Sequence, residues 1–311
     1  MPARTVLAID IGGTKLAAGV VDDAGQVLDR AEVPTPREGD AEAWFAAIAT
    51  VASTVARGDE LACGVGCGGP MAPGGESVSP LNVAQVRDFP LRRRVAEATG
   101  LPTWVDNDAK ALALGEGWVG AAAGVADFVA LVVSTGVGGG IVLEGRLLDG
   151  AAGNAGHIGH VIVEPGGRRC GCGANGCLEA EASGTAIAAA TGRAPADAEP
   201  ELRRRTGMLV GRAVASVANL LDLRLAVVAG SVALGYGDDF FAAAQDELDA
   251  RSKLSFSAGA RIVPAGLGAA GPVVGAAAVA WRQIDPGSLQ STTGTWRSGY
   301  DDGATNHDSI A

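Results

Sequence analysis

Residues 5–21 read TVLAIDIGGTKLAAGVV, and this stretch decides the expected fold. Two apolar runs flank the turn IGGTK, which predicts a β-hairpin, and residues 26–32 predict a third strand. The first strand delivers Asp10 to the turn, where Gly12 and Gly13 can adopt backbone angles that are closed to other residues.

The turn chemistry predicts a phosphate site. Thr14 and its neighbours are free to point N–H and hydroxyl groups at phosphate oxygens. Asp10 could hold a hydrated Mg²⁺ ion against those oxygens, because Mg²⁺ takes one or two carboxylates and keeps several waters. An ordinary hairpin with a glycine turn explains the stretch equally well when it is taken alone.

A second copy of the pattern favours phosphate binding. Residues 127–146 read DFVALVVSTGVGGGIVLEGR, again two apolar strands around a glycine-rich turn. The repeat predicts a duplicated unit in which two facing turns grip one nucleotide. In VVAGSVALG, residues 227–235, Gly230 and Ser231 stand at a strand-to-helix turn that could pass close to the nucleoside.

The remaining patterns predict a mixed sheet with helices on its faces. Residues 41–57 are alanine-rich and place Trp44, Ile48, Val51 and Val55 on one helical face. Further strands are expected at 61–67, 102–106 and 224–230, and further helices at 90–99, 108–118, 199–221, 238–252 and 271–281.

The length of 311 residues predicts about two lobes. We expect a small N-terminal lobe over 1–115 and a larger one over 116–270, with a helix at about 271–284 packing back on the first lobe. Residues 285–311 are polar and rich in Gly, Ser, Thr and Asp, which predicts a disordered tail.

Composition and charge narrow the class of protein. The net charge of −11 and a pI near 4.8 argue against a surface for nucleic acid. No apolar run approaches the ~20 residues that cross a bilayer, and no signal peptide is recognisable, so we expect a cytoplasmic location and no membrane partner. Cys63 and Cys67 stand in an apolar run and are interpreted as small core residues.

The segment WVDNDAKALALGE, residues 104–116, places Asp106, Asn107 and Asp108 between a strand and a helix. Either aspartate could simply cap the helix. In a phosphotransferase, a carboxylate at this point is the natural acceptor of a hydroxyl proton.

A metal site is predicted by His160 and three cysteines that follow it at +10, +12 and +17, namely Cys170, Cys172 and Cys177. Three thiolates and one imidazole form the closed tetrahedral set of a structural zinc, with no open position for catalysis. His157 is the alternative histidine ligand, and chance clustering is the remaining explanation.

DIGGTK, NDA at 107–109, STGVGGG, GH at 159–160 and CGCGANGCLE at 170–179 together resemble the ROK family of bacterial sugar kinases and sugar-responsive repressors. The resemblance runs in order from residue 5 to about residue 283. It implies an α/β, two-lobed, ribonuclease H-like fold of the actin and hexokinase superfamily. Duplicated β-β-β-α-β-α-β-α units would enclose a cleft in which a sugar meets ATP and Mg²⁺.

The resemblance also implies roles for single residues. Asp108 would be the catalytic base, with Asn107 beside it as a sugar ligand. The ATP phosphates would contact Gly12, Gly13, Thr14, Lys15, Thr135 and Gly136; zinc would bind His160, Cys170, Cys172 and Cys177; and further sugar contacts would come from Gly69, Asn82, His160 and Glu179.

One position departs from the family pattern. The family usually has E-x-G-H where this chain has HIGH, so His157 replaces a glutamate that accepts hydrogen bonds from the sugar. A carboxylate only accepts, whereas a neutral imidazole offers one donor and one acceptor. We therefore expect His157 to contact the sugar and to alter the choice of substrate.

The leading expectation is a glucokinase-like enzyme that phosphorylates a hexose 6-hydroxyl with ATP. The alternatives are a kinase for an N-acetylated hexosamine, mannose, fructose or a C7 cyclitol, and a sugar-binding repressor. Repressors of the family carry an additional N-terminal helix-turn-helix domain, whereas the first strand begins here at about Thr5. Polyphosphate stays open as the donor, and the resemblance implies a homodimer or homotetramer.

Overall fold

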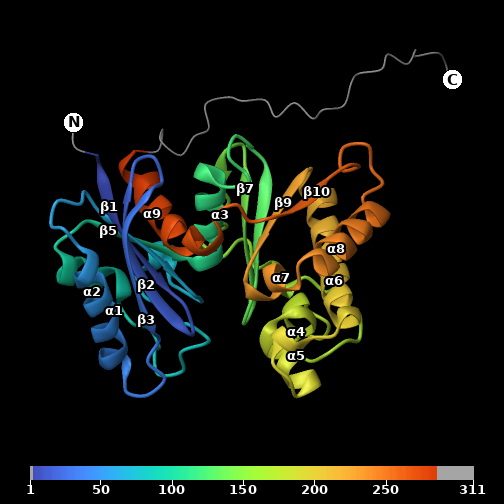
Figure 1. The fold of residues 1–311 in the computed structure, drawn as a ribbon, viewed down its shortest axis with the longest axis horizontal. Coiled ribbons are helices and arrows are strands. Elements are labelled where there is room, and N and C mark those ends of the chain that lie inside the picture. The colour runs from blue at the N-terminus through green and yellow to red at the C-terminus, as the bar shows by residue number, and fades with distance from the viewer. Residues whose placement is uncertain (1–2, 286–311) are drawn as a thin grey trace, which may run out of the picture.

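The computed structural model describes residues 3–285, which form two lobes that each contain a five-stranded mixed sheet (Figure 1). The first sheet has the order β3-β2-β1-β4-β5 and the second has the order β10-β9-β6-β7-β8. The strands of the first sheet are β1 (Thr5–Ile11), β2 (Lys15–Asp22), β3 (Val27–Pro34), β4 (Cys63–Cys67) and β5 (Thr103–Asn107). Those of the second are β6 (Phe128–Val133), β7 (Val137–Leu143), β8 (Arg146–Leu147), β9 (Leu225–Ala229) and β10 (Arg261–Pro264).

Helices cover both faces of the first sheet. α1 (Ala41–Val55) and α2 (Leu91–Thr99) pack on one face, against alternate residues of β1 such as Leu7 and Ile9. α9 (Gly271–Ile284) packs on the other face, against Val6 and Ala8. Alternate residues of one strand thus serve two cores, which explains why β1 is apolar on both sides.

α9 follows the second lobe in the chain but lies against the first sheet, beside α3 (Asp108–Val119), between the two lobes (Figure 1). The packing is close because glycines meet at the contacts. A Cβ on Gly64 would lie 2.0 Å from the Ala276 carbonyl oxygen, and one on Gly115 would lie 3.0 Å from the Gly275 Cα.

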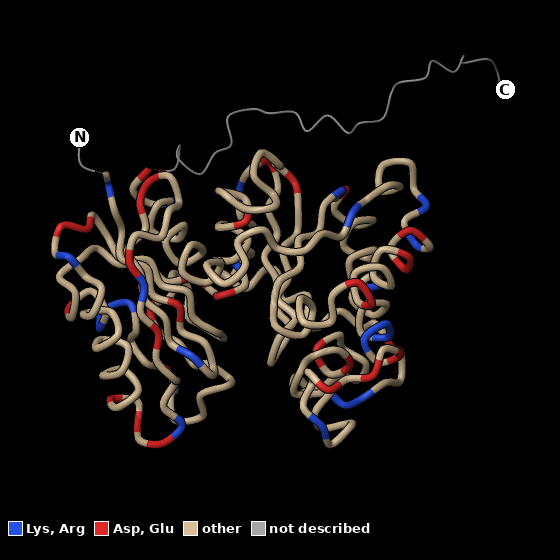
Figure 2. The backbone as a smooth tube through the Cα atoms, viewed as in Figure 1, with Lys and Arg blue, Asp and Glu red and all other residues tan. Residues whose placement is uncertain are grey.

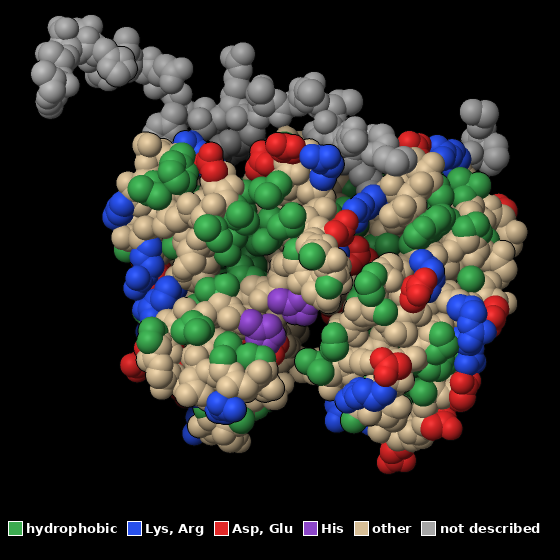
Figure 3. All heavy atoms as spheres, turned by 180° about the vertical axis from the view of Figure 1, so that it is seen from behind, with side chains coloured by type: hydrophobic (Ala, Val, Ile, Leu, Met, Phe, Trp, Pro, Cys, Tyr) green, Lys and Arg blue, Asp and Glu red, His purple; other side chains and the backbone are tan. Residues whose placement is uncertain are grey.

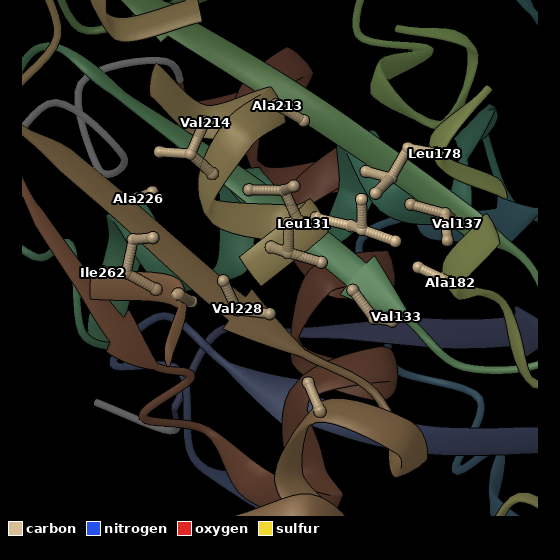
Figure 4. Close-up of a cluster of buried hydrophobic side chains, with 14 of the residues drawn as sticks. Leu131, Val133, Val137, Leu178, Ala182, Ala213, Val214, Ala226, Val228 and Ile262 are labelled. Carbon is tan, nitrogen blue, oxygen red and sulfur yellow. The ribbon is translucent and has the colours of Figure 1, made fainter. Parts of the chain in front are cut away.

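The core of the second lobe forms between its sheet and helices α4 (Leu178–Ala182) and α6 (Pro200–Leu221) (Figure 4). Leu131 and Val133 of β6 and Val228 of β9 are buried there. α5 (Gly184–Thr191), α7 (Ser231–Tyr236) and α8 (Asp238–Arg251) complete the lobe.

The expected fold class is confirmed. The first lobe follows β-β-β-α-β-α-β-α in full. The second repeats the order with α4 and α5 inserted between β8 and α6, and with two helices, α7 and α8, between β9 and β10. In both lobes an antiparallel hairpin leads, and a later strand pairs parallel to its first strand. Cys63 and Cys67 are buried, as expected for core residues.

Three expectations need comment. The helix expected over 41–57 ends at Val55, where Ala56 leaves the helical backbone region. No helix of the described residues 3–285 is both long and apolar enough to cross a membrane. The disordered tail is expected over 285–311, and residues 286–311 of it lie outside the described residues.

Candidate active site

A cavity of about 1110 Å³ opens between the two lobes. Every residue for which the sequence predicted a sugar or nucleotide contact lines it. These residues are Asp10, Gly12, Gly13, Thr14, Lys15, Gly69, Asn82, Asn107, Asp108, Thr135, Gly136, His157, His160, Glu179, Gly230 and Ser231. A second hollow of about 720 Å³ between α6 and α8 contains none of them.

Asp108 is the first residue of α3, and it opens into the cavity. Asn107, rather than either aspartate, is the N-cap: its side-chain oxygen accepts from the Ala109 N–H at 3.0 Å. The Asp108 carboxylate accepts from the same N–H at 2.9 Å. Desolvation by the surrounding walls raises the pKa of Asp108, and the backbone hydrogen bond opposes that rise.

Asp10 at the end of β1 is the second carboxylate on the cavity floor. Gly66 separates the two: a Cβ added there would lie 3.6 Å from an Asp10 carboxylate oxygen and 3.7 Å from the Asp108 Cα. Burial first, and then the charge of Asp108, raise the pKa of Asp10 to about 7. Asp10 forms no ion pair within residues 3–285. A partly buried carboxylate that forms no ion pair, beside a glycine turn, fits a hydrated divalent cation.

The turn between β1 and β2 faces the same cavity. The Gly12 N–H donates to the Lys15 carbonyl at 3.0 Å, which closes the turn. Thr14 is exposed toward the cavity. Lys15 also lines the cavity, and its ammonium is paired with Glu32 at 3.0 Å.

The turn between β6 and β7 lies across the cavity and is held by two neighbouring segments. The Thr135 carbonyl accepts from the Thr185 hydroxyl at 2.9 Å, which ties the turn to the start of α5. The Ser231 and Ser134 hydroxyls lie 3.0 Å apart, which ties it to α7. Gly230 has a φ of +101°, and a Cβ there would lie 2.3 Å from the Val133 carbonyl, so the β9–α7 turn requires glycine.

The predicted sugar contacts approach Asp108 from both lobes. Asn107 lies beside Gly69: a Cβ added to the glycine would lie 3.6 Å from the Asn107 side-chain nitrogen. From the second lobe, Glu179 at the start of α4 accepts from the Val137 N–H at 3.0 Å. This contact fixes one carboxylate oxygen of Glu179 and leaves the other free for a ligand.

The two histidines lie at the opening between the lobes (Figure 3). Their rings stack with centroids 6.0 Å apart and an angle of 15° between planes. Desolvation first, and then the neighbouring His160, lower the pKa of His157. His157 is therefore neutral at neutral pH, with one N–H to donate.

Four side chains form a candidate metal centre beside the cavity. His160, Cys170, Cys172 and Cys177 offer ligand atoms that all lie within 4.8 Å of one another. The His160 Nδ1 lies 3.8 Å from the Cys170 Sγ, and the Cys172 and Cys177 sulfurs lie 3.7 Å apart. Tetrahedral ligands at about 2.3 Å from zinc would lie about 3.8 Å apart, so the set fits that ion. His157 is not a member of this cluster.

Sequence reasoning missed some of the cavity wall. Ala186, Ala189 and Ala190 of α5 line the cavity, as do Arg168 and Arg169 ahead of the cysteines. α5 has only eight residues, so its periodicity was too short to recognise; the small side chains at i, i+3 and i+4 were the available signal.

Acidic and basic residues are interspersed over both lobes (Figure 2). Together with the net charge of −11, this distribution agrees with a protein that acts on small molecules.

The chain is similar to sugar kinases of known sequence and structure. The ROK family profile matches residues 6–283. The N-acetylmannosamine kinase of Escherichia fergusonii is 40% identical over 250 residues, covering 75% of this chain and 85% of the relative. A ROK family glucokinase from Streptomyces griseus, solved with glucose and AMPPNP, superposes with a TM-score of 0.77 at 31% identity, covering 88% of this chain and 98% of that one. A ROK hexokinase from Thermus thermophilus gives 0.75 at 35% identity, covering 91% and 100%. The chain belongs to the ROK family.

Proposed function

We propose that this protein phosphorylates an N-acetylated hexosamine with ATP, and that N-acetylmannosamine is its substrate. The reaction class, ATP-dependent sugar phosphorylation, is supported by the sugar kinases among its relatives. The main structural support for this reaction class is the position of Asp108, which lines the same cavity as the two glycine turns.

Asp108 acts as the general base. Its carboxylate takes the proton of a sugar hydroxyl while the hydroxyl oxygen bonds to the γ-phosphorus and the bond from that phosphorus to the bridging oxygen breaks. ADP and a sugar phosphate leave, and the proton passes from Asp108 to solvent. The raised pKa of Asp108 makes its carboxylate a stronger base than an exposed aspartate.

The two glycine turns hold the phosphates. Backbone N–H groups at Gly13 and Gly136 provide donors without side-chain bulk, and Gly12 closes the first turn. Asp10 is the residue that would hold Mg²⁺ with its waters, and the ion would supply positive charge to the phosphates. Gly230 and Ser231 support the nucleoside end.

The choice of an N-acetylated sugar rests on His157 and on the relatives at 40% identity. An acetamido group carries a carbonyl oxygen that needs a donor, and a carboxylate at this position cannot provide one. Neutral His157 can donate its N–H to that oxygen. The sequence favoured glucose as the common family substrate; the glutamate-to-histidine difference favours the N-acetylated alternative.

Glucose is the second candidate, because the solved glucokinase and hexokinase cover nearly the whole described chain at 31% and 35% identity. We further propose a structural zinc on His160 and the three cysteines, a cytoplasmic location, and a homodimer or homotetramer.

A coupled assay of ADP release tests the proposal. The panel contains N-acetylmannosamine, N-acetylglucosamine, glucose, mannose, fructose and a C7 cyclitol, each with MgATP and with polyphosphate. We expect the highest kcat/KM for N-acetylmannosamine with MgATP. If kcat/KM were about tenfold higher for glucose than for N-acetylmannosamine, glucose would replace N-acetylmannosamine as the proposed substrate. An absence of sugar-dependent ADP release would refute the reaction class.

His157→Glu tests the specificity argument. The ratio of kcat/KM for N-acetylmannosamine to that for glucose should fall about two- to tenfold, since one hydrogen bond contributes about 0.5 to 1.5 kcal/mol. His157→Gln is the matched control, because its amide keeps a donor and should preserve much of the ratio. An unchanged ratio in His157→Glu would mean that this residue does not select the sugar.

A further inference from the structure

Four charged side chains close a ring beside the cavity without lining it. The Lys110 ammonium lies 3.0 Å from an Asp106 carboxylate oxygen and 2.8 Å from one of Asp149. The Arg282 guanidinium lies 2.8 Å from the other Asp149 oxygen and 3.8 Å from the other Asp106 oxygen. Charges thus alternate around a four-charge ring made by Asp106, Lys110, Asp149 and Arg282.

Lys110 lies at the buried end of this ring. Its side chain is 3% exposed, and its ammonium also donates to the Gly153 carbonyl at 3.2 Å. An ammonium at this depth needs its carboxylate partners, because burial of an isolated charge is strongly unfavourable. Burial acts to raise the pKa of Asp149, but hydrogen bonds from Arg282 and Lys110 outweigh it and hold the pKa below its usual range.

One side of the four-charge ring belongs to the turn that carries the base. The Asp106 oxygen that pairs with Lys110 also accepts from the Asn107 N–H at 2.8 Å. Asn107 caps α3, and Asp108 stands between Asn107 and the helix turn that bears Lys110. The Asp106–Lys110 pair therefore spans the segment that bears Asp108.

The other side belongs to the loop that carries His157. Asp149 follows β8, and its carbonyl accepts from the Ala155 N–H at 3.0 Å, two residues before His157. Lys110 holds this loop at two points, the Asp149 carboxylate and the Gly153 carbonyl. Arg282 of α9 closes the ring from a third element.

We propose that Lys110 is a positioning residue that fixes the turn bearing Asp108 relative to the loop bearing His157, so that the sugar hydroxyl is held in line with its base. Within residues 3–285, no ion pair or side-chain hydrogen bond joins this ring to the turns at 12–15 and 134–136. The inference rests on the proposed sugar kinase reaction but not on the identity of the sugar.

Steady-state kinetics of Lys110→Met, Lys110→Arg, Asp149→Asn and the Lys110→Met/Asp149→Asn double variant test it. The substrate is whichever sugar the wild-type enzyme phosphorylates best, so a wrong sugar in the proposed function leaves the test intact. Glu144→Gln is the matched control, since it breaks an exposed ion pair with Arg146 in the same lobe as Asp149.

Lys110→Met should lower kcat/KM for the sugar by at least about tenfold, because a small misplacement of reacting groups costs up to about a hundredfold. The KM for MgATP should change by less than about twofold, a split that a general loss of stability would not produce. Lys110→Arg should recover part of the loss. The double variant should lose less than the product of the single losses, because both act through one ring.

Equal effects on sugar and MgATP, or a sugar kcat/KM within about twofold of wild type, would overturn the proposal. If Lys110→Met does not fold, Asp149→Asn decides the question, because Asp149 is half exposed and its amide can be solvated. If the loss of kcat/KM in the double variant equals the product of the two single losses, Lys110 and Asp149 act separately, which also contradicts the proposal.

Discussion

Asp108 and Asp10 are carboxylates on one cavity floor, but their neutralisation is expected to have different consequences. Asp108→Asn removes the proton acceptor and keeps an oxygen that can still accept from the Ala109 N–H. Turnover should fall at least about 10²-fold, the usual contribution of a general base, while the calorimetric Kd for the sugar stays close to wild type. Near-native turnover in this variant would rule out the assignment of the base.

Asp10→Asn should remove activity and yet stabilise the magnesium-free protein above neutral pH. The pKa of Asp10 is raised from 3.8 to about 7 in the folded state, so the folded protein binds a proton that the unfolded chain has lost between about pH 4 and pH 7. The contribution of this group to stability therefore decreases as pH rises through that window and stays at its lowest value above it.

The expected result is a higher Tm for Asp10→Asn at pH 8 than for wild type, with a smaller difference at pH 5. The free-energy gain is on the order of a few kcal/mol at most, since each pKa unit corresponds to about 1.4 kcal/mol. Thermal unfolding in magnesium-free buffer without chelator, which leaves the cysteine cluster undisturbed, measures it. A Tm difference that is the same at both pH values would contradict the raised pKa.

Among the elements, the loop from His160 to Cys177 is the one whose order is expected to depend on a metal. Cys172→Ser, or chelation of the wild-type protein, should lower the Tm and raise the KM for the sugar more than that for ATP, because Cys170 and Arg169 line the cavity. A local loss of about 2 kcal/mol corresponds to roughly 3 °C in a protein of this size.

Elemental analysis and thermal unfolding with and without chelator check the zinc prediction. Chelator should cause no further loss in Cys172→Ser, which is the internal control. Wild-type protein that contains no zinc and shows the same Tm with chelator would mean that the cluster is not a metal centre.

The sequence predicted the long elements of the fold well, because apolar periodicity and glycine turns are local signals. The two hairpins, α1, α3, α6 and α9 are present where expected. It failed for α5 and for the two-residue strand β8, which are too short to carry a period. The sequence indicates Asp106 or Asp108 as the cap of α3, whereas the cap is Asn107. Which of these side chains reaches the Ala109 N–H depends on local geometry that the sequence does not show.

The candidate site was predictable only as far as motifs extend. The motifs identify the residues that each lobe contributes. In the folded molecule these residues line one cavity between the lobes. The four-charge ring joins residues as far apart in sequence as Asp149 and Arg282, and no local pattern connects them. Contacts of this kind form only when the whole molecule has folded.

For the whole molecule, α9 helps to join the two lobes, since it follows the second lobe in the chain and packs on the sheet of the first. Its contact with α3 leaves no room for a side chain. A Cβ on Gly275 would lie 2.6 Å from the Ala111 carbonyl oxygen and 2.8 Å from its carbon. Because these neighbours are backbone atoms, the two helices would have to separate.

Gly275→Ala should therefore lower the free energy of unfolding by about 1 to 3 kcal/mol, the usual cost of overpacking, although alanine favours a helix over glycine by about 1 kcal/mol. Gly235→Ala in α7 is the matched control: nothing lies within 4 Å of the added Cβ, so helix propensity alone should act and stability should stay level or rise. Urea unfolding of both variants measures the difference. If Gly275→Ala were as stable as Gly235→Ala, the α3–α9 contact would be looser than the structure shows. In that case α9 could not hold Arg282, at its C-terminal end, firmly against Asp149.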